Sequence, residues 1–348
     1  MRRTYAVRRK VGRSRCYLFW VTPLDIHPAG PNRRRFLAAS AGGALAACSS
    51  SQPEPEVSQA SEEPALDGGF IDGHVHVWTP DTDAYPISPK YEKADMKPPS
   101  FTPEELFAHC RPLGVERINL IQMSFYQDDH RYMLDMMASH PGIFSGTGLL
   151  TDITADGARP ADRMRELGDK GLKAFRIGGR SSADGPGWME HPNYKELYKV
   201  ASERGLILSF LVNPADLAEV DRLCAEFPDA PVIIDHLARL RVASPTLAED
   251  TEKLLRLADR PKVWVKVGAF YALSADGPPY VDLLPLIQRV VSTFGAERCM
   301  WESDCPFQVQ PPNTYAASVE LIRDRADFLS NDQKRQLLSK TAESLLFA

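Results

Sequence analysis

Short apolar runs alternate with amphipathic segments along most of the chain, from about residue 69 to its end. Eight of the runs have the length and the β-branched and aromatic content of buried strands. These runs are Phe70–Val77, Arg117–Met123, Ile143–Leu150, Leu172–Ile177, Leu206–Val212, Val232–His236, Val263–Gly268 and Cys299–Asp304. The pattern therefore predicts eight strands separated by segments of another periodicity.

The segments between the runs space their apolar positions as one face of a helix does. They predict helices over Thr102–Arg111, Asn193–Arg204, Ala215–Phe227, Ser244–Ala258 and Val281–Phe294. Thr102 followed by Pro103 and two glutamates is typical of a helix start, and Pro214 opens another helix in the same way.

Eight strand–helix repeats over about 280 residues predict the α/β class, as a single-domain (β/α)8 TIM barrel. An open, doubly wound sheet is the alternative fold. It is disfavoured because no GxGxxG pattern follows the first predicted strand.

The composition of the 348 residues, 43% hydrophobic and 25% charged, is that of a globular protein. The charge is uneven. Residues 1–48 hold ten Lys or Arg and one acid, which leaves 31 basic and 45 acidic residues in 49–348, a net charge of −14. Binding to nucleic acid needs clustered positive charge, so we expect no nucleic-acid partner.

The basic N-terminal segment resembles a twin-arginine export signal, because Arg33-Arg34-Arg35-Phe36-Leu37 precedes about ten small, weakly apolar residues. That stretch is too short to span a bilayer permanently. Leu45-Ala46-Ala47-Cys48 resembles a lipoprotein box, in which Cys48 is acylated and becomes the new N-terminus. A basic surface helix and an ordinary signal-peptidase site are the alternatives.

These features predict three regions: residues 1–48 as export signal with lipobox, 49–68 as flexible tether, and 69–348 as the barrel. We expect a lipoprotein exported by the twin-arginine route and anchored to a membrane outside the cytoplasm. The six cysteines match no zinc-binding or CxxC spacing, and apart from Cys48 we expect buried free thiols.

Polar residues end several of the predicted strands, where a barrel places its active site. His74 and His76 end the first strand, and residues two apart on a strand point the same way, so both imidazoles can bind one divalent cation. Asp304 ends the last strand and could ligate the cation and accept a proton from water whose pKa the cation lowers. His236 ends the sixth strand. The alternatives are surface histidines, an aspartate N-cap and a structural histidine.

Several segments together resemble the amidohydrolase superfamily, and within it the lactonase-like branch of the amidohydrolase-related TIM-barrel hydrolases. They are Ile71–Trp78, Tyr85-Pro86, Lys173–Arg176, Ile233–Ala238, Val263–Gly268, Trp301–Pro306 and Thr341–Phe347. The resemblance implies a metal-dependent hydrolase with Asp304 and His236 as catalytic residues. It implies metal ligation among His74, His76, His236 and Asp304, and Arg176 as a clamp for a substrate carboxylate.

The chain departs from the family pattern at two strands. The fifth strand ends in Asn213 without a histidine, and the fourth carries Arg176 where dinuclear members place a bridging lysine. Lys173 lies three residues earlier and should face the opposite side. We therefore expect one divalent metal ion. Imidazole and carboxylate ligands favour zinc, manganese is an alternative, and a metal-free site stays open.

The expected reaction is opening of a lactone or similar carboxylic ester by metal-activated water, on a small lactone or carboxylate substrate. We further expect Trp78, Lys266 and Tyr271 to contact the substrate, Glu302 to line the pocket, and the long Trp78–Ser100 segment to cap it. One alternative is nonoxidative decarboxylation of an aromatic or unsaturated acid. Another is a lipid-anchored binding protein on a decayed barrel, which the presence of all four proposed site residues disfavours.

Overall fold

The computed structural model describes Leu66 and residues 68–348. The expected export signal, Cys48 and nearly all of the expected tether lie outside the described residues. Among the residues described, no helix combines the length and the apolar character needed to cross a membrane.

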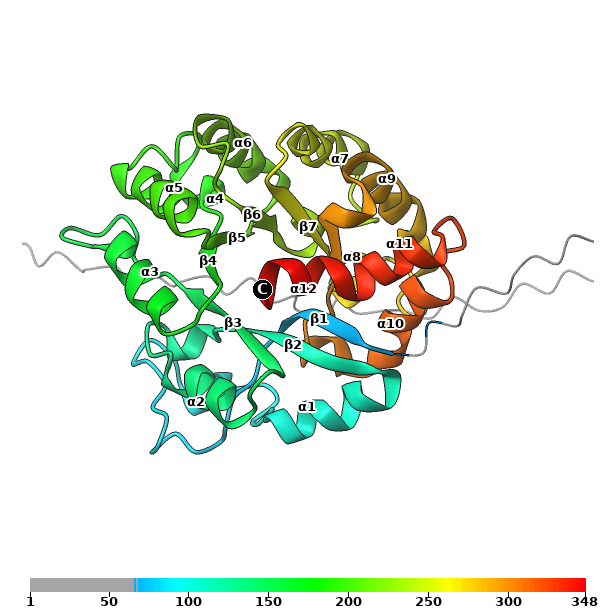
Figure 1. Ribbon diagram of the computed structural model, residues 1–348, viewed down its shortest axis with the longest axis horizontal. Coiled ribbons are helices and arrows are strands. Elements are labelled where there is room, and N and C mark those ends of the chain that lie inside the picture. Colours follow the sequence, from blue (N-terminus) through cyan, green and yellow to red (C-terminus); the bar gives the residue numbers. More distant parts are fainter. Residues whose placement is uncertain (1–65, 67) are drawn as a thin grey trace, which may run out of the picture. The chain divides into compact units, whose positions relative to one another are not determined.

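Eight parallel strands form one sheet in chain order, each paired with the next (Figure 1). A parallel bridge between Val75 and Cys305 joins the first strand to the segment after the last and nearly closes the ring. The predicted TIM barrel is confirmed. The strands are β1 Phe70–Val75, β2 Val115–Ile121, β3 Phe144–Leu149, β4 Ala174–Gly178, β5 Ile207–Leu211, β6 Val232–Ile234, β7 Val263–Val267 and β8 Cys299–Trp301.

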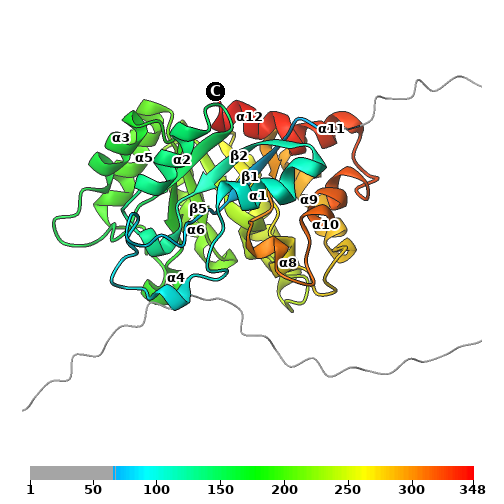
Figure 2. The ribbon, with the colours of Figure 1, turned by 90° about the horizontal axis from the view of Figure 1, so that it is seen from below.

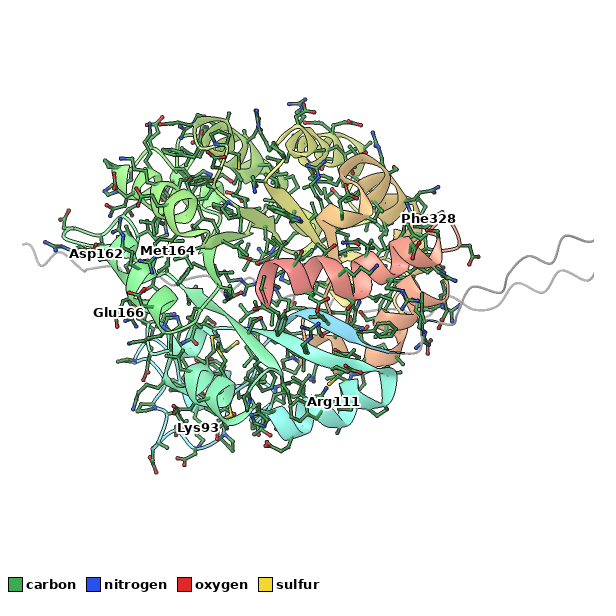
Figure 3. All side chains as sticks on the ribbon, in the orientation of Figure 1. Lys93, Arg111, Asp162, Met164, Glu166 and Phe328 are labelled. Carbon is green, nitrogen blue, oxygen red and sulfur yellow. The ribbon has the colours of Figure 1, made fainter. Side chains whose placement is uncertain are left out.

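Helices surround the barrel, and each of the five predicted helical segments corresponds to one; four are shorter than predicted, and α5 begins one residue earlier. Figure 3 shows the pattern on α3, where Asp162 and Glu166 lie on the outer side and the buried Met164 turns inward. The α-helices are α1 Pro103–Cys110, α2 Arg131–Ser139, α3 Pro160–Asp169, α4 Ser181–Asp184, α5 Pro192–Arg204, α6 Leu217–Glu226, α7 Leu247–Leu255, α8 Phe270–Leu273, α9 Leu284–Phe294, α10 Tyr315–Arg323, α11 Asn331–Arg335 and α12 Thr341–Leu346.

The C-terminal helices cover the amino-terminal end of the barrel, while α4 and α8 lie at the opposite end (Figure 2). On α12, the fully buried Ala342 and Leu346 pack against the inward side chains of five strands, which are Ile71, Ala174, Ile207, Ile233 and Met300. This contact excludes water from the floor of the barrel and leaves the carboxyl-terminal end for chemistry.

Seven of the eight strands end one to three residues earlier than the sequence predicts, and in β6 and β8 the backbone leaves the ladder before the candidate site residue. After β6 the chain enters the left-handed region at His236, and after β8 it does so at Asp304, with φ of 55° and 63°. In β1 a bulge between Asp72 and Val75 adds a residue to the strand. The Nδ2 of Asn119 donates to the carbonyl oxygen of Gly73 in this bulge, at 3.1 Å.

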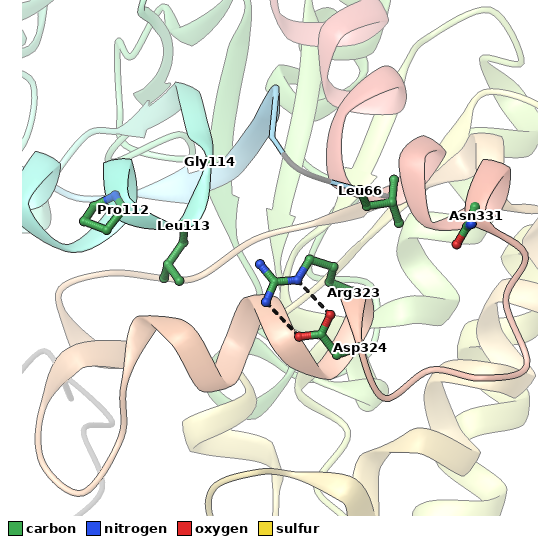
Figure 4. A pocket seen from close by; sticks show the side chains of 7 residues that line it. All are labelled: Leu66, Pro112, Leu113, Gly114, Arg323, Asp324 and Asn331. Atoms are coloured by element: carbon green, nitrogen blue, oxygen red, sulfur yellow. Dashed lines mark hydrogen bonds and ion pairs between the residues drawn. The ribbon is translucent and has the colours of Figure 1, made fainter. Parts of the chain in front are cut away.

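All four described cysteines, Cys110, Cys224, Cys299 and Cys305, are buried free thiols, which confirms the prediction for them. A separate cavity of about 360 Å³ lies beside the amino-terminal ends of β1 and β2 (Figure 4). It is lined by Leu66, Pro112, Leu113, Gly114, Arg323, Asp324 and Asn331, and its two charges pair with each other. Its lining therefore offers no nucleophile and no metal-ligating set.

Candidate active site

The three histidines predicted from two strand ends meet at the carboxyl-terminal end of the barrel. The ring centre of His74 lies 5.1 Å from that of His76 and 4.5 Å from that of His236. Asp304 is within reach of all three: its carboxylate lies 3.6 Å from His74 Nε2, 3.4 Å from His76 Nε2 and 3.9 Å from His236 Nε2. The structure thus brings these four side chains into one cluster.

The atoms around Asp304 suit a divalent cation. The Nδ1 of His76 lies 3.1 Å from the carbonyl oxygen of Ile121 and donates to it, so its Nε2 presents a lone pair to Asp304 Oδ1. Burial lowers the pKa of His76 to about 4, although the nearby Asp304 carboxylate acts against this shift. His74, His76 and Asp304 form a set whose ligand atoms lie within 4.8 Å of one another.

Asp304 is held as a carboxylate. Burial alone would raise its pKa, but His236, His76 and His74 together lower the pKa below its usual range. The hydroxyl of Tyr271, just inside α8, donates to Oδ2 at 2.8 Å, and the Asp304 backbone N donates to the His74 carbonyl oxygen at 2.9 Å. The carboxylate is therefore ionised and fixed in direction.

His236 begins a left-handed turn of four consecutive residues, His236–Arg239, none of them glycine. Glu302, directly after β8, holds this turn: its Oε1 lies 2.5 Å from His236 Nδ1 and accepts the His236 backbone N–H at 3.2 Å. Burial would lower the pKa of His236, but the charges of Glu302 and Asp304 raise it above its ordinary value. His236 also belongs to a second possible ligand group, with His74 and Glu302.

Arg176 on β4 lies among the histidines. Its Nη2 is 3.0 Å from His74 Nε2 and 3.3 Å from His236 Nε2, and its Nε donates to Asp235 at 3.4 Å. The side chain is nearly buried, and its Nη1 has no hydrogen bond to any described residue. That nitrogen can therefore donate to a further acceptor.

Lys266, expected near the substrate, is fully buried beneath His74. Its Nζ lies 3.2 Å from His74 Nδ1 and 3.0 Å from Asp235 Oδ1, which Ser209 also hydrogen-bonds at 2.9 Å. This places the ammonium among the charges behind the histidines. Trp78 is likewise fully buried: its indole donates to the Pro98 carbonyl oxygen at 2.9 Å, so it packs in the wall.

The segment Trp78–Ser100 is tied at its ends and packs beside the mouth. Trp78 and Phe101 form an antiparallel bridge, and the Ser88 backbone N donates to the Phe125 carbonyl oxygen after β2, at 2.7 Å. Lys173 points to the other end, where its Nζ donates to the carbonyl oxygen of Ala348 at 2.6 Å. It therefore contributes nothing to a dinuclear centre.

Sequence reasoning gave no role to Asp235, and Glu302 only a place in the pocket. Both carboxylates are fully buried and hold cluster members from behind. Each is adjacent in sequence to, or two residues from, a candidate residue. That adjacency was the available signal, and strand alternation supports it, because Asp235 lies two residues after the inward Ile233 and Glu302 two residues after the inward Met300. The left-handed backbone that begins at His236 then brings this residue to the same side as Asp235.

The amidohydrolase family model matches residues 71–348. The chain belongs to this family. It is 27% identical over 237 residues to L-fucono-1,5-lactonase from Burkholderia ambifaria, covering 68% of this chain and 80% of that protein. It is 26% identical over 277 residues to 4-sulfomuconolactone hydrolase from Hydrogenophaga intermedia, covering 78% and 86%.

Solved structures of amidohydrolases share the fold. One from Burkholderia multivorans, determined with bound zinc, superposes with a TM-score of 0.64 and 20% identity, covering 79% of this chain and 98% of that one. The family assignment and the lactone-hydrolysing relatives support the predicted enzyme class, a hydrolase.

Proposed function

We propose that this amidohydrolase opens a lactone that carries a carboxylate or similar anionic group. The observation that carries the proposal is the meeting of an ionised Asp304 with the Nε2 atoms of His74 and His76, beside the unshared Nη1 of Arg176. Both curated relatives described above act on lactones. Arg239, half-buried at the end of the left-handed turn, adds a second guanidinium to this side and favours an anionic substrate.

The residues divide the steps of hydrolysis between them. Asp304 accepts a proton from water, and the water oxygen attacks the carbonyl carbon. Nη1 of Arg176 orients the substrate through a carboxylate or the carbonyl oxygen, and the guanidinium stabilises the developing oxyanion beside His236. The ring C–O bond then breaks, and Asp304 returns its proton to the leaving oxygen, giving a hydroxy acid.

We propose that His74, His76 and Asp304 hold one divalent cation, with zinc favoured by the imidazole and carboxylate donors. When bound, it would polarise the lactone carbonyl and lower the pKa of a coordinated water. Binding would require Nη2 of Arg176 to leave the lone pair of His74 Nε2, which it approaches to 3.0 Å.

The test is a panel of sugar lactones and carboxylated muconolactones, with acid release followed by a pH indicator. The purified protein is assayed as isolated, after chelation, and after addition of Zn²⁺ or Mn²⁺. We expect turnover of anionic lactones above that of neutral ones. Carbon dioxide release from aromatic acids without lactone opening would overturn the proposal, as would ligand binding without turnover.

We also propose that the chain is exported by the twin-arginine route and anchored through acylated Cys48. The support is the sequence pattern Arg33-Arg34 … Leu45-Ala46-Ala47-Cys48. Stable anchoring of a protein to a membrane needs at least two acyl chains, and bacterial lipoproteins carry that many.

We expect Cys48→Ala to abolish incorporation of labelled fatty acid and to move the protein from the membrane to the soluble fraction. Cys16→Ala serves as the matched control, since Cys16 lies outside the lipobox. Unchanged labelling of the Cys48 variant would contradict the anchor, and export of a variant with Lys at positions 33 and 34 would contradict the route.

A further inference from the structure

One buried carboxylate, Glu302, spans two of the site's histidines from behind. Its Oε1 is 2.5 Å from the Nδ1 of His236, and its Oε2 is 3.0 Å from the Nδ1 of His74. Its side chain has no solvent exposure. A single group therefore contacts the same ring position on histidines that come from opposite sides of the barrel.

We propose that Glu302 is a positioning residue that fixes both His74 and His236 as Nδ1–H tautomers and so aims their Nε2 lone pairs at the reacting centre. The inference rests on the proposed function only where it gives these lone pairs a role in metal binding or catalysis. Its structural part stands alone, because an ionised carboxylate accepts hydrogen bonds and cannot donate them. Which imidazole nitrogen keeps its proton is set by the partner of the other nitrogen.

The surroundings of His74 require such an acceptor. Arg176 Nη2 lies 3.0 Å from its Nε2 and Lys266 Nζ lies 3.2 Å from its Nδ1, so a cationic donor faces each ring nitrogen. A neutral imidazole offers only one nitrogen lone pair, so both donors cannot be accepted. The ammonium of Lys266 has the Asp235 carboxylate at 3.0 Å as an alternative partner.

The surroundings of Glu302 Oε2 also favour a proton on His74 Nδ1. It is buried and has no well-aligned hydrogen-bond donor among the described residues. A buried carboxylate oxygen without a donor is costly; His74 Nδ1 lies 3.0 Å away, and a proton there would bond to Oε2 after a small turn of the ring or the carboxylate. The same proton leaves Nε2 free to accept from Arg176 or to bind a metal ion.

The space for Glu302 is provided by the residue after β7. A Cβ at Gly268 would overlap the Cγ and the carbonyl oxygen of Glu302. Oε1 also accepts the backbone N–H of His236, the first residue of the left-handed turn. Glu302 therefore fixes both the ring and the backbone of His236.

Glu302→Gln gives a directional test, because the amide has one accepting oxygen and one donating nitrogen. The oxygen should stay on His236, where two donors meet it, which turns the NH₂ toward His74 Nδ1. We therefore expect His74 to change to the Nε2–H tautomer while His236 keeps Nδ1–H. Nitrogen NMR of ¹⁵N-histidine in the full chain reads each tautomer, with His74→Asn and His236→Asn variants for assignment.

The kinetic test measures kcat and KM separately, on a lactone that the wild type hydrolyses. We expect Glu302→Gln to lower kcat about 10- to 100-fold with little change in KM, the size usual for groups that orient ligand histidines. Glu297→Gln, an exposed glutamate just before β8, is the matched control and should match wild type in both readouts.

An Nε2–H tautomer at either histidine in the wild type would overturn the proposal, and so would a Glu302→Gln variant with wild-type spectra and kcat. A wild type that hydrolyses no lactone would overturn the proposed function instead. In that event the nitrogen spectra alone would still support or overturn the assignment of Glu302.

Discussion

Five non-glycine residues next to the reacting centre have left-handed backbone: Asp304 and the turn His236–Arg239. An L-residue in this region costs roughly 1–2 kcal/mol, because Cβ approaches the following carbonyl oxygen. The buried contacts of Glu302 on His236 and of Tyr271 on Asp304 offset this cost. Two of these strained residues, His236 and Asp304, have side chains that meet at the mouth of the barrel.

Asp304→Asn should lower kcat about 10²- to 10⁴-fold, because an amide cannot take the proton of the attacking water. The side chain keeps its volume, so the melting temperature should stay near that of the wild type. Steady-state kinetics and thermal unfolding check both parts. Asp327→Asn, at an exposed site among the C-terminal helices, is the control. Near-normal turnover of the Asp304 variant would remove this residue from catalysis.

At this scale the sequence predicted which side chains meet but not their partners. His74, His76, Asp304 and Arg176 were placed by strand ends alone. Asp235 and Glu302 continue the inward alternation of their strands, but the approach of His236 to them depends on a left-handed turn of four residues without glycine, which no residue pattern signals. The buried position of Lys266 depends on which of two faces a short strand turns inward.

The connections between strands and helices contain their own buried polar links. His130, just before α2, is buried: its Nδ1 lies 2.9 Å from the Asp128 carbonyl oxygen, and the Leu149 backbone N donates to its Nε2 at 2.9 Å. Its ring thereby ties the β2–α2 connection to the end of β3, and it can do so only as a neutral imidazole.

The stability of the protein should therefore fall with acidification partly through His130. Burial lowers its pKa below the ordinary value, so the unfolded chain binds the proton more readily. The contribution is fully present above an unfolded pKa of about 6.5 and is lost as the pH falls below it. Urea unfolding between pH 7 and 5 should show that the free energy of unfolding changes less with pH in His130→Gln than in the wild type. The exposed His109→Gln should keep the wild-type slope, and equal slopes in all three proteins would contradict this role.

At the level of elements the sequence was nearly sufficient. Apolar periodicity located all eight strands and the five predicted helices, because each βα unit repeats the same burial pattern. Strand ends were less predictable: β6 and β8 stop before His236 and Asp304, since the ladder is abandoned where side chains must converge. Polar residues follow both strands, Asp235-His236 and Glu302-Ser303-Asp304, and polarity alone does not say where the ladder ends.

The last helix of the chain, α12, closes the amino-terminal end of the barrel. Leu346 on α12 is fully buried against Ile71 and the inward side chains of neighbouring strands. Leu346→Ala should destabilise the protein by about 2–5 kcal/mol, since a cavity opens at the floor of the barrel. Denaturant unfolding measures this, with exposed Ser344→Ala on the same helix as control. A loss as small as the control's would show that α12 is dispensable.

The hydrogen bonds between β1 and the segment after β8 determine when the site forms during folding. The Asp72 carboxylate accepts the backbone N–H of Ser303 across 231 residues of sequence, and the His74 carbonyl oxygen accepts that of Asp304. Loop closure of this length comes late and slowly in folding. A refolding chain with seven strands assembled would already bury tryptophans, which changes their fluorescence, but it would still have no activity. Recovered activity should therefore lag behind recovered fluorescence, and a nascent chain becomes an enzyme only with its final strand.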